Sequence, residues 1–444
     1  MQPADFMTET LKRAPWGPQA AEILCAAIQA VDPYKVVERQ LYLVGDQLHL
    51  GRQTYNLRKN KRIFLVGAGK AGLPMTQAVV DKLGIWITDG LVIVKEGYGG
   101  PANVGPVQIV EAGHPIPDQR GLAATQSMLA LLANAQQDDL VLVVLSGGGS
   151  ALLTSPVPGV PLQELQLLTN LLLASGATIE EINRIRKHLD TVKGGGLARA
   201  AAPAAVAAMI LSDVVGDPLD LIASGPTVSP SGRWQPGLEL IARYGLEAKL
   251  PPAVLKALHA PPQPPLFSET LLNNILVGNN EVAARGAMDK AQQLGYNTQL
   301  LTTTMQGEAR LVGSQMSAQL RAFAEAGKPR PAVWVAGGET TVTLGGEGMG
   351  GRNQELALAA VEGLAGLERA ALISLATDGG DGPTNAAGAI VTGQTLARAS
   401  ALGLDPDSYL KTHDSFLFFS RLGDCLLPGP TRTNVNDLLF LFLF

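Results

Sequence analysis

The sequence predicts an α/β fold in which buried parallel strands alternate with helices. Short apolar runs recur along the chain, and five of them end in glycine, serine or acid, at Gly67, Ser146, Asp213, Gly337 and Asp378. Runs of this kind are typical of strands buried on both faces of a sheet. A chain of 444 residues is too long to form a single ordinary hydrophobic core, which indicates two or three domains.

Composition and charge argue against several classes of protein. The chain has 34 basic and 39 acidic residues and a net charge of −5, so nothing in it favours nucleic-acid binding. Its two cysteines allow no disulfide framework, and we expect a reduced, cytoplasmic protein. No secretory signal is seen in residues 1–30. The apolar ending Leu438–Phe444 is far shorter than the ~20 residues of a membrane span, so we expect a strand there.

The first candidate anion site follows a buried strand at Ile63–Val66. The next residues, Gly67–Gly72, match the dinucleotide fingerprint G-x-G-x-x-G, although the match alone is weak. Lys70 stands in the turn itself, and the spacing does not fit a Walker A loop. A lysine at a helix start opposes the helix dipole by about 0.3–1 kcal/mol unless an anion is near. Lys70 is therefore predicted to bind phosphate or carboxylate, with a solvated surface lysine as the alternative.

The second candidate is the turn after the apolar run Leu140–Leu145. Glycines lack a Cβ, so the backbone can turn sharply and present its N–H groups to a ligand. A turn that feeds a helix N-terminus suits phosphate or carboxylate, and a tight turn without a ligand is the alternative. Upstream, His114 in a proline-rich loop either touches substrate or packs the loop. The turn consists of Ser146, Gly147, Gly148, Gly149 and Ser150.

Two further residues in this half have chemical potential. Thr178 and Glu181 have the spacing of a capping box, and the helix they open leads to Lys193 and a glycine turn. Lys193 is a candidate second anion contact. Asp213 directly follows the strand predicted over 206–212, where it could hold Mg²⁺ or accept a proton. Helix capping is the alternative for Asp213.

A proline-rich stretch divides the sequence. Six prolines occur between Pro251 and Pro265, which predicts a linker and hence domains over 1–260 and 261–444. Beyond it the glycine-rich Gly345–Gly351 delivers Arg352 to a helix start, where its planar fork suits carboxylate or phosphate. Strands are expected over 274–278, 296–302, 333–336, 340–344 and 372–377, and helices over 281–294 and 308–325.

Acidic residues follow the last of these strands. Asp378 and Asp381, separated by glycines, fit a hard divalent cation, or else an Asx-turn loop without metal. Asp414, after His413, is expected to cap a helix. Ligands of open α/β sheets bind outside the carboxyl ends of the strands. If these loops meet there, they bring together two cations, several glycine turns and several carboxylates, a combination that suits phosphoryl transfer. Three of the loops come before the linker and two after it, which predicts an active site in a cleft between two lobes.

The ordered set of motifs resembles the class II glycerate 2-kinases, the MOFRL family. The resemblance rests on LVGAGKAG, VVLSGGGSALL, NRIRKHLDTVKGGGLA, LSDVVGDPLDLIASGPT, GGETTVTLGGEGMGGRNQE, ATDGGDGPTNAAGA and PTRTNVNDL. It implies a Rossmann-like N-terminal domain, a smaller α/β C-terminal domain and an active site between them. It also implies ATP- and Mg²⁺-dependent phosphorylation of D-glycerate at the 2-hydroxyl. The family's active-site lysine and arginine fall on Lys70 and Arg352.

These expectations combine into one mechanistic hypothesis. Amides of the Ser146–Ser150 turn, with Lys193, hold the ATP phosphates, and Lys70 and Arg352 steady the phosphoryl group and the glycerate carboxylate. Mg²⁺ is carried by some of Asp213, Asp378 and Asp381. The alternative is an NAD(P)-dependent hydroxypyruvate reductase, and a homodimer stays open. The chain departs from the family pattern at Asn385, where Asp is usual, and at Arg432, where Gly is usual.

Overall fold

The computed structural model describes residues 1–229, 237–260, 268–343, 345–346 and 348–444, which form two compact units. One unit is Pro33–Val277, and the other joins Met1–Asp32 to Gly278–Phe444. These bounds differ from the predicted division at residue 260. Most of the predicted linker lies outside the described residues or forms the helix α11 (Pro252–His259).

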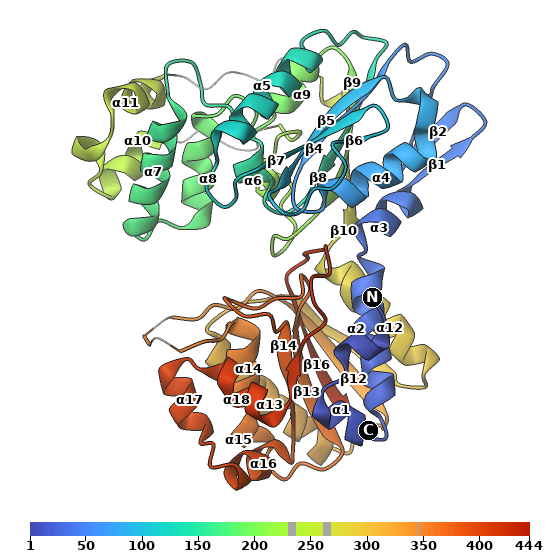
Figure 1. Cartoon of the computed structure of the whole chain (residues 1–444), viewed down its shortest axis with the longest axis vertical. Coiled ribbons are helices and arrows are strands. Elements are labelled where there is room, and N and C mark those ends of the chain that lie inside the picture. Colours follow the sequence, from blue (N-terminus) through green and yellow to red (C-terminus); the bar gives the residue numbers. More distant parts are fainter. Residues whose placement is uncertain (230–236, 261–267, 344, 347) are drawn as a thin grey trace. The chain divides into compact units, whose positions relative to one another are not determined.

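The N-terminal segment joins the second unit through helix packing. Helix α2 (Gly17–Ala30) lies along α12 (Asn280–Gln293), as Figure 1 shows. The two helices approach so closely that a Cβ at Gly286 would clash with Ala30. Trp16 also stacks on the terminal ring of Phe444, with centroids 3.8 Å apart. Burial of these apolar surfaces explains why a segment remote in sequence belongs to this unit.

The unit Pro33–Val277 is built on a mostly parallel sheet of seven strands, which confirms the predicted α/β class. The chain adds strands on one side of β4 and then returns to add β8 and β9 on the other side. The loops after β4 and β8 therefore meet at a topological switch point, where α/β sheets bind ligands. In spatial order the strands are β10 (Leu272–Gly278), β9 (Ala205–Leu211), β8 (Leu140–Leu145), β4 (Ile63–Ala68), β5 (Asp89–Lys95), β7 (Val107–Ala112) and β6 (Asn103–Val104).

Helices and a small sheet cover this scaffold. A separate apolar cluster, which includes Leu168, Ile185 and Ile241, holds α7, α8, α10 and α11 together. Residues 41–56 form a separate three-stranded antiparallel sheet. The remaining elements of the unit are α3 (Pro33–Gln40), β1 (Leu41–Val44), β2 (Gln47–Leu50), β3 (Gln53–Asn56), α4 (Gly72–Leu83), α5 (Gln119–Leu132), α6 (Gly149–Leu152), α7 (Leu162–Ala174), α8 (Ile179–His188), α9 (Gly196–Ala201) and α10 (Gly237–Arg243).

The second unit is organised around its last strand. The apolar ending forms β16, which lies antiparallel between β12 and β13, so the predicted terminal strand is confirmed and is central. Both of its neighbours are completely buried, which explains the continuous apolar run. The sheet order is β11 (Asn297–Met305), β12 (Ala332–Gly338), β16 (Asp437–Leu443), β13 (Ala370–Ala376), β14 (Gly388–Thr392) and β15 (Cys425–Leu426).

The antiparallel direction of β16 has a consequence for chemistry. Its first residue, Asp437, pairs in register with Gly338 of β12 and Ala376 of β13. The residues that follow those two strands therefore lie at the edge where β16 begins. Residues 340–343 form no strand, in contrast to the expectation. The other helices of the unit are α1 (Glu9–Arg13), α13 (Ala309–Glu325), α14 (Arg352–Ala359), α15 (Val361–Leu364), α16 (Thr395–Ala401), α17 (Pro406–Thr412) and α18 (Ser415–Leu422).

No helix in the described part of the chain combines the length and apolar character needed to cross a membrane.

Candidate functional site

The turns after β4 and β8 brace one another in the unit Pro33–Val277. The N–H of Lys70 donates to the carbonyl of Gly147 at 2.8 Å, and the N–H of Ala71 donates to Ser146 Oγ at 3.0 Å. Gly69 has φ of 144° and lies so close to Ser146 that a Cβ would clash with it. The glycine at position 69 is thus required by close approach, and the two turns form one rigid structure.

This structure presents the ammonium group of Lys70 and two backbone amides. Within the described residues of this unit, Lys70 Nζ and the N–H groups of Gly147 and Gly148 donate no hydrogen bond. The amides of Ser146 and Gly149, predicted to hold phosphate as well, donate instead to Ala68 and Ser146 carbonyls. The turn therefore offers fewer anion-binding amides than the sequence suggests.

Ser150 and Asp213 border the same turn. Ser150 Oγ bonds to Ser224 Oγ at 2.8 Å, which gives that hydroxyl a structural partner. The carboxylate of Asp213, after β9, lies against Gly147, where any side chain would clash with it. The structure thus brings together the predicted residues Lys70, Gly147 and Asp213.

Lys193 has a different role from the predicted phosphate contact. Its side chain is only 1% exposed, and its ammonium donates to the Leu153 carbonyl, Thr154 Oγ1 and Asp190 Oδ2 at 2.8–3.0 Å. A lysine ammonium has three N–H donors, so none is left for a nucleotide. The basic residue heads a glycine turn, as the sequence indicated, but its charge is neutralised inside the protein.

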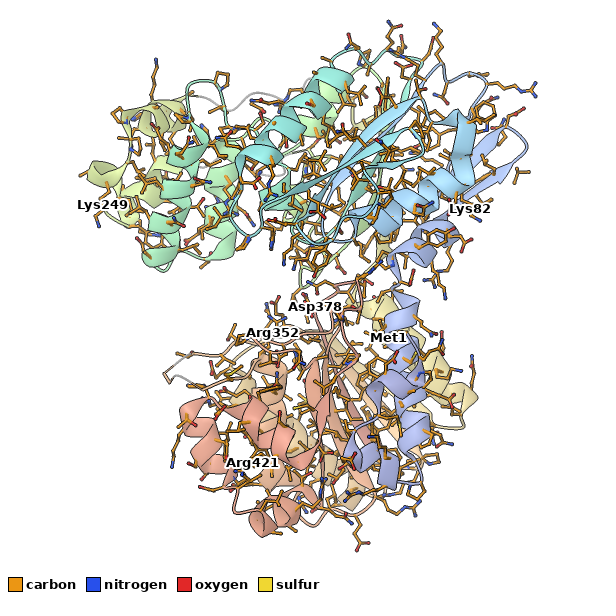
Figure 2. The ribbon with its side chains drawn as sticks, in the orientation of Figure 1. Met1, Lys82, Lys249, Arg352, Asp378 and Arg421 are labelled. Carbon is orange, nitrogen blue, oxygen red and sulfur yellow. The ribbon has the colours of Figure 1, made fainter. Side chains whose placement is uncertain are left out.

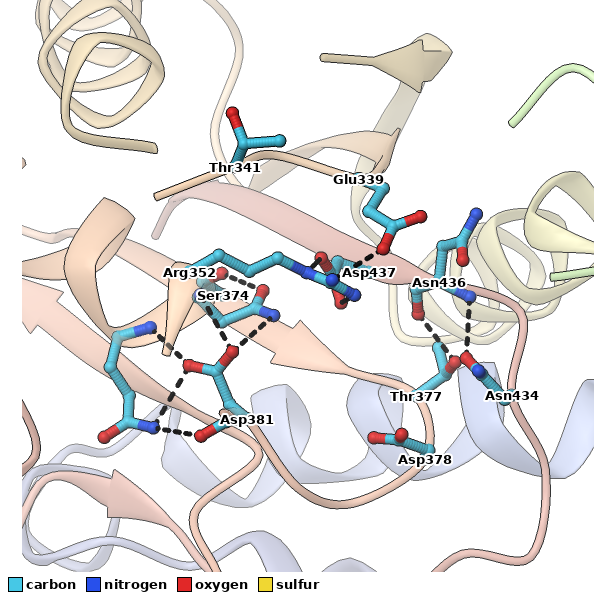
Figure 3. A network of polar contacts seen from close by, with 12 residues as sticks. Glu339, Thr341, Arg352, Ser374, Thr377, Asp378, Asp381, Asn434, Asn436 and Asp437 are labelled. Carbon is cyan, nitrogen blue, oxygen red and sulfur yellow. Dashed lines mark hydrogen bonds and ion pairs between the residues drawn. The ribbon is translucent and has the colours of Figure 1, made fainter. Parts of the chain in front are cut away.

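Arg352, in the second unit, is held by two carboxylates. Its Nε and NH2 donate to the two oxygens of Asp437 at 2.6 and 3.2 Å, and NH1 donates to Glu339 at 2.6 Å (Figure 3). Burial disfavours the guanidinium charge, but the two carboxylates outweigh it, and the pKa of Arg352 is raised. The guanidinium makes its bidentate contact with Asp437 of the same unit, and the predicted contact with a ligand carboxylate or phosphate stays a prediction.

Asp437 and Glu339 differ in exposure. The Asp437 side chain is 3% exposed, and burial raises its pKa to about 6 despite the neighbouring guanidinium. Glu339, which follows β12, is 40% exposed. Asp437 is thus a fixed internal partner of Arg352, whereas Glu339 faces solvent. Sequence analysis missed both as site residues, although each is an acid at a strand end.

Asp381 acts as a helix cap. Its two oxygens accept the N–H groups of Asn353 and Gln354 at 3.2 and 2.9 Å, and also bonds from the side chains of both residues. Burial raises its pKa, against the effect of these donors. The prediction that Asp381 binds a metal is therefore wrong. Both of its carboxylate oxygens already accept hydrogen bonds from the first residues of α14.

We expect Asp381→Ala to lower the free energy of unfolding by about 1–3 kcal/mol, because it leaves buried amides at the start of α14 without acceptors. Chemical denaturation measures this loss. Mg²⁺ titration of the same variant should give the wild-type affinity. A weakened Mg²⁺ affinity at unchanged stability would contradict the capping role.

Asp378 and the cavity beside it complete this region. Asp378 Oδ1 accepts the N–H of Gly380 at 3.2 Å, which is the alternative Asx-turn geometry, while the side chain stays half-buried. Figure 2 shows Arg352 and Asp378 close together at one end of the unit. A cavity of about 700 Å³ is lined by both residues and by Glu339, Glu355 and His413. Among the described residues, no three acidic, histidine or cysteine side chains cluster as a ready metal site.

The glycine-rich segment before Arg352 is anchored to the turn between α17 and α18. The Gly345 N–H donates to His413 Nε2 at 3.1 Å, and the Gly348 N–H donates to the Thr412 carbonyl. Asp414 is at the start of α18, but its side chain accepts the Met349 N–H and does not cap the helix. A Cβ at Gly346 or Gly348 would collide with the carbonyl of Thr412, and one at Gly350 with the side chain of Ser415. Arg352 is thereby positioned without a ligand.

The two departures from the family pattern have different settings. Asn385 is exposed, and the neighbouring turn is closed by Thr384, whose side-chain oxygen accepts from the Ala386 N–H. Arg432 has φ of 64°, the left-handed conformation that glycine adopts without strain. The usual glycine at that position is explained by the backbone, and arginine is accommodated there at some cost in conformational energy.

Comparison with known proteins gives a consistent picture. A model described as a domain of unknown function, DUF4147, matches residues 19–259, and the MOFRL family model matches residues 332–437. The chain is 41% identical to a D-glycerate 2-kinase of Thermotoga maritima, covering 98% of this chain and 99% of that protein. It is 38% identical to a glycerate 2-kinase of Pyrococcus horikoshii, covering 93% and 94%. A crystal structure of glycerate kinase from Thermotoga maritima matches with a TM-score of 0.86 and 40% identity, covering 96% of this chain and 99% of that one.

Proposed function

The chain belongs to the glycerate kinase family with a C-terminal MOFRL domain, and from that premise we propose that it phosphorylates D-glycerate. ATP donates the phosphoryl group to the 2-hydroxyl, which yields 2-phospho-D-glycerate and ADP. The observation that carries this proposal is the contact of the Lys70 turn with the Gly147–Gly148 turn, whose two amides donate no hydrogen bond within the described residues of the unit, at the switch point of a parallel sheet.

The β4 and β8 turns bind the phosphate chain in this mechanism. Backbone N–H groups that are fixed before the ligand arrives stabilise phosphate oxygens without a cost of reorganisation. Lys70 adds a full positive charge beside them, where negative charge accumulates during transfer. Gly69 permits the close approach of the two turns, because a Cβ there would clash with Ser146. Gly148, with φ of 83°, takes a left-handed conformation that glycine adopts without strain.

Arg352 binds the carboxylate of D-glycerate or the transferred phosphoryl group. Asp437 holds one edge of its guanidinium, so the NH1 side is the part that faces the cavity with Glu339. Glu339 is exposed enough to move when an anion arrives, whereas Asp437 keeps Arg352 oriented. A planar fork held along one edge is preorganised for a second anion along the other.

Mg²⁺ fits the chemistry of some predicted ligands and not of others. Carboxylate oxygens are its preferred protein ligands, and Asp213 and Asp378 are both partly exposed. Asp381 is committed to α14, so we assign it no metal role. When bound, Mg²⁺ neutralises charge on the phosphate oxygens of ATP. Asp213 is the candidate that would hold it in the unit Pro33–Val277, and Asp378 is the candidate in the second unit.

Lys70→Ala is expected to lower kcat/KM for D-glycerate at least ~100-fold, the scale of one lost transition-state contact. The ammonium of Lys70 has no described partner in its unit, so removing it leaves no buried charge unpaired and stability should not change. Steady-state kinetics and a thermal melt of the same preparation give both values. Near-normal turnover in the folded variant would remove Lys70 from the mechanism.

A coupled ADP-release assay with D-glycerate, L-glycerate and hydroxypyruvate tests the proposed reaction. We expect ADP release with D-glycerate, ATP and Mg²⁺, and 2-phospho-D-glycerate as the product identified by NMR. A change in nicotinamide absorbance with hydroxypyruvate, without ADP release, would support a reductase in place of a kinase.

A further inference from the structure

Helix α8 carries a cation that no protein group neutralises by direct contact. Lys187 pairs with Asp220 at 3.1 Å, and Arg184 also has a partner. Among the residues that the structure describes, by contrast, none accepts a hydrogen bond or an ion pair from the guanidinium of Arg186. The side chain is only partly exposed, and burial lowers its pKa against the opposing effect of Asp190. A partly buried cation without a bonded partner is unfavourable, which indicates an anionic ligand.

Asp190, the nearby carboxylate, already has its own donors. Its Oδ1 accepts the N–H of Val192, and its Oδ2 accepts the ammonium of Lys193 at 2.9 Å and two further bonds. The charge of Asp190 is therefore matched by Lys193, and the guanidinium of Arg186 stays available to a ligand.

Hydrogen bonds connect the same face of α8 to the turn after β8. Asn183 lies three residues before Arg186, so the two side chains are neighbours on the helix surface. Asn183 Oδ1 accepts from Ser224 Oγ at 3.5 Å, and Ser224 Oγ bonds to Ser150 Oγ at 2.8 Å. Ser150 is the last residue of the turn whose amides are proposed to bind phosphate. This face of α8 thus adjoins the proposed phosphate site.

The backbone fixes Ser224 in this bridging position. Ala223 and Ser224 have φ of 50° and 62°, a left-handed conformation that is strained for residues other than glycine. The carbonyl of Ser224 accepts the N–H of Gly194 at 3.0 Å, and a Cβ placed on Gly149 would lie 2.8 Å from Ala223 Cβ. The contact between α8 and the turn after β8 is therefore held from several sides.

Two groups on this face have N–H donors for a ligand. Asn183 is 8% exposed, and within the described residues its Nδ2 donates no hydrogen bond and is not completely enclosed. The guanidinium of Arg186 adds a planar fork that matches the two oxygens of a carboxylate. A single positive charge suits one carboxylate, whereas a phosphate chain carries several negative charges and has Lys70 and two amides to bind it.

We propose that Arg186 and Asn183 bind the carboxylate of the acceptor substrate, next to the phosphate-binding turn. This inference rests on the proposed kinase function, with D-glycerate as the acceptor. The site makes a carboxylate part of what the protein recognises, so an uncharged analogue of D-glycerate binds more weakly.

The test removes the same contact from each side in the full-length protein. Arg186→Met keeps an unbranched stem without charge or N–H donors, and Arg186→Lys keeps the charge without the fork. The methyl ester of D-glycerate lacks the carboxylate charge. Arg184→Met is the matched control, because Arg184 is an exposed cation of the same helix. Calorimetric titrations use D-glycerate or its ester with ADP present, and separately ATP, and thermal melts establish that each variant is folded.

We expect Arg186→Met to weaken D-glycerate binding at least about tenfold, the scale of one hydrogen bond to a charged group. The affinity for ATP should not change. Arg186→Lys should lose less, and Arg184→Met should match the wild type. The wild type should bind the ester more weakly than D-glycerate, whereas Arg186→Met should bind the two ligands alike. Since Arg186 has no described bonded partner, the melting temperature of Arg186→Met should not fall.

Several outcomes overturn the proposal. A folded Arg186→Met variant with unchanged D-glycerate affinity removes Arg186 from the substrate site, and a lowered melting temperature in that variant makes it a structural residue. An equal loss of affinity for the ester contradicts a carboxylate contact, and a loss of ATP affinity alone makes Arg186 a phosphate contact. If the wild type binds D-glycerate but releases no ADP, the kinase proposal fails separately, and the titrations still decide the role of Arg186.

Discussion

Arg352→Ala is expected to have two large effects at once: kcat/KM for D-glycerate falls at least ~100-fold, and the protein loses about 3–5 kcal/mol of stability. The first effect follows from the proposed contact with an anion. The second follows from Asp437, which is 3% exposed and would be left as a buried carboxylate without its bidentate partner. Activity assays and chemical denaturation measure the two effects separately.

Arg352→Lys separates charge from geometry. Lysine restores a positive charge near Asp437 but cannot engage Asp437 and an incoming anion with one planar fork. We therefore expect most of the stability to return while kcat/KM stays well below the wild-type value. Equal recovery of both quantities would mean that Arg352 acts only as a structural counter-ion for Asp437.

The sequence was sufficient to locate the strand ends where the candidate residues lie. Continuous apolar runs identify β4 and β8, and an acid, glycine or lysine after such a run identifies a loop at the sheet edge. A cation at a helix start opposes the dipole, which points to Lys70, and the planar fork of Arg352 at the start of a helix points to an anion there. For Arg352, the structure supplies the missing counter-charges, in Asp437 and Glu339.

The pairings across the fold could not be predicted in the same way. The apolar run at the end of the chain indicates a strand, but only the topology reveals that it is antiparallel and central. That direction places Asp437 beside Arg352, which is 85 residues earlier in the chain. Likewise, no periodicity in residues 1–32 indicates that this segment packs against α12 in the second unit.

Basic residues near glycine turns show most clearly what the local sequence cannot predict. Lys70 and Lys193 have similar local sequences, each next to glycines that precede a helix. One ammonium has no described partner in its unit, and the other is enclosed by three oxygens. Burial decides between binding and structural roles, and burial depends on contacts that the local sequence does not encode.

Lys193→Met is expected to lower the stability of the protein by about 3–5 kcal/mol, because it leaves Asp190 buried without its counter-ion. Asp190 is completely buried and accepts hydrogen bonds from Thr154 and Ser155, so the carboxylate cannot reach solvent. A loss of that size corresponds to a drop in melting temperature on the order of 10 °C for a unit of this length.

Asp190→Asn combined with Lys193→Met provides the control. The double variant has no uncompensated charge, so it should recover part of the stability that the single variant loses. The KM for ATP, measured below the melting temperature, discriminates between the two roles of Lys193. If Lys193 contacts phosphate directly, the KM for ATP should rise equally in both variants. If Lys193 acts only in the buried ion pair, the KM for ATP should be lower in the more stable double variant than in the single variant. An equally raised KM for ATP in the two variants would mean that Lys193 contacts the nucleotide.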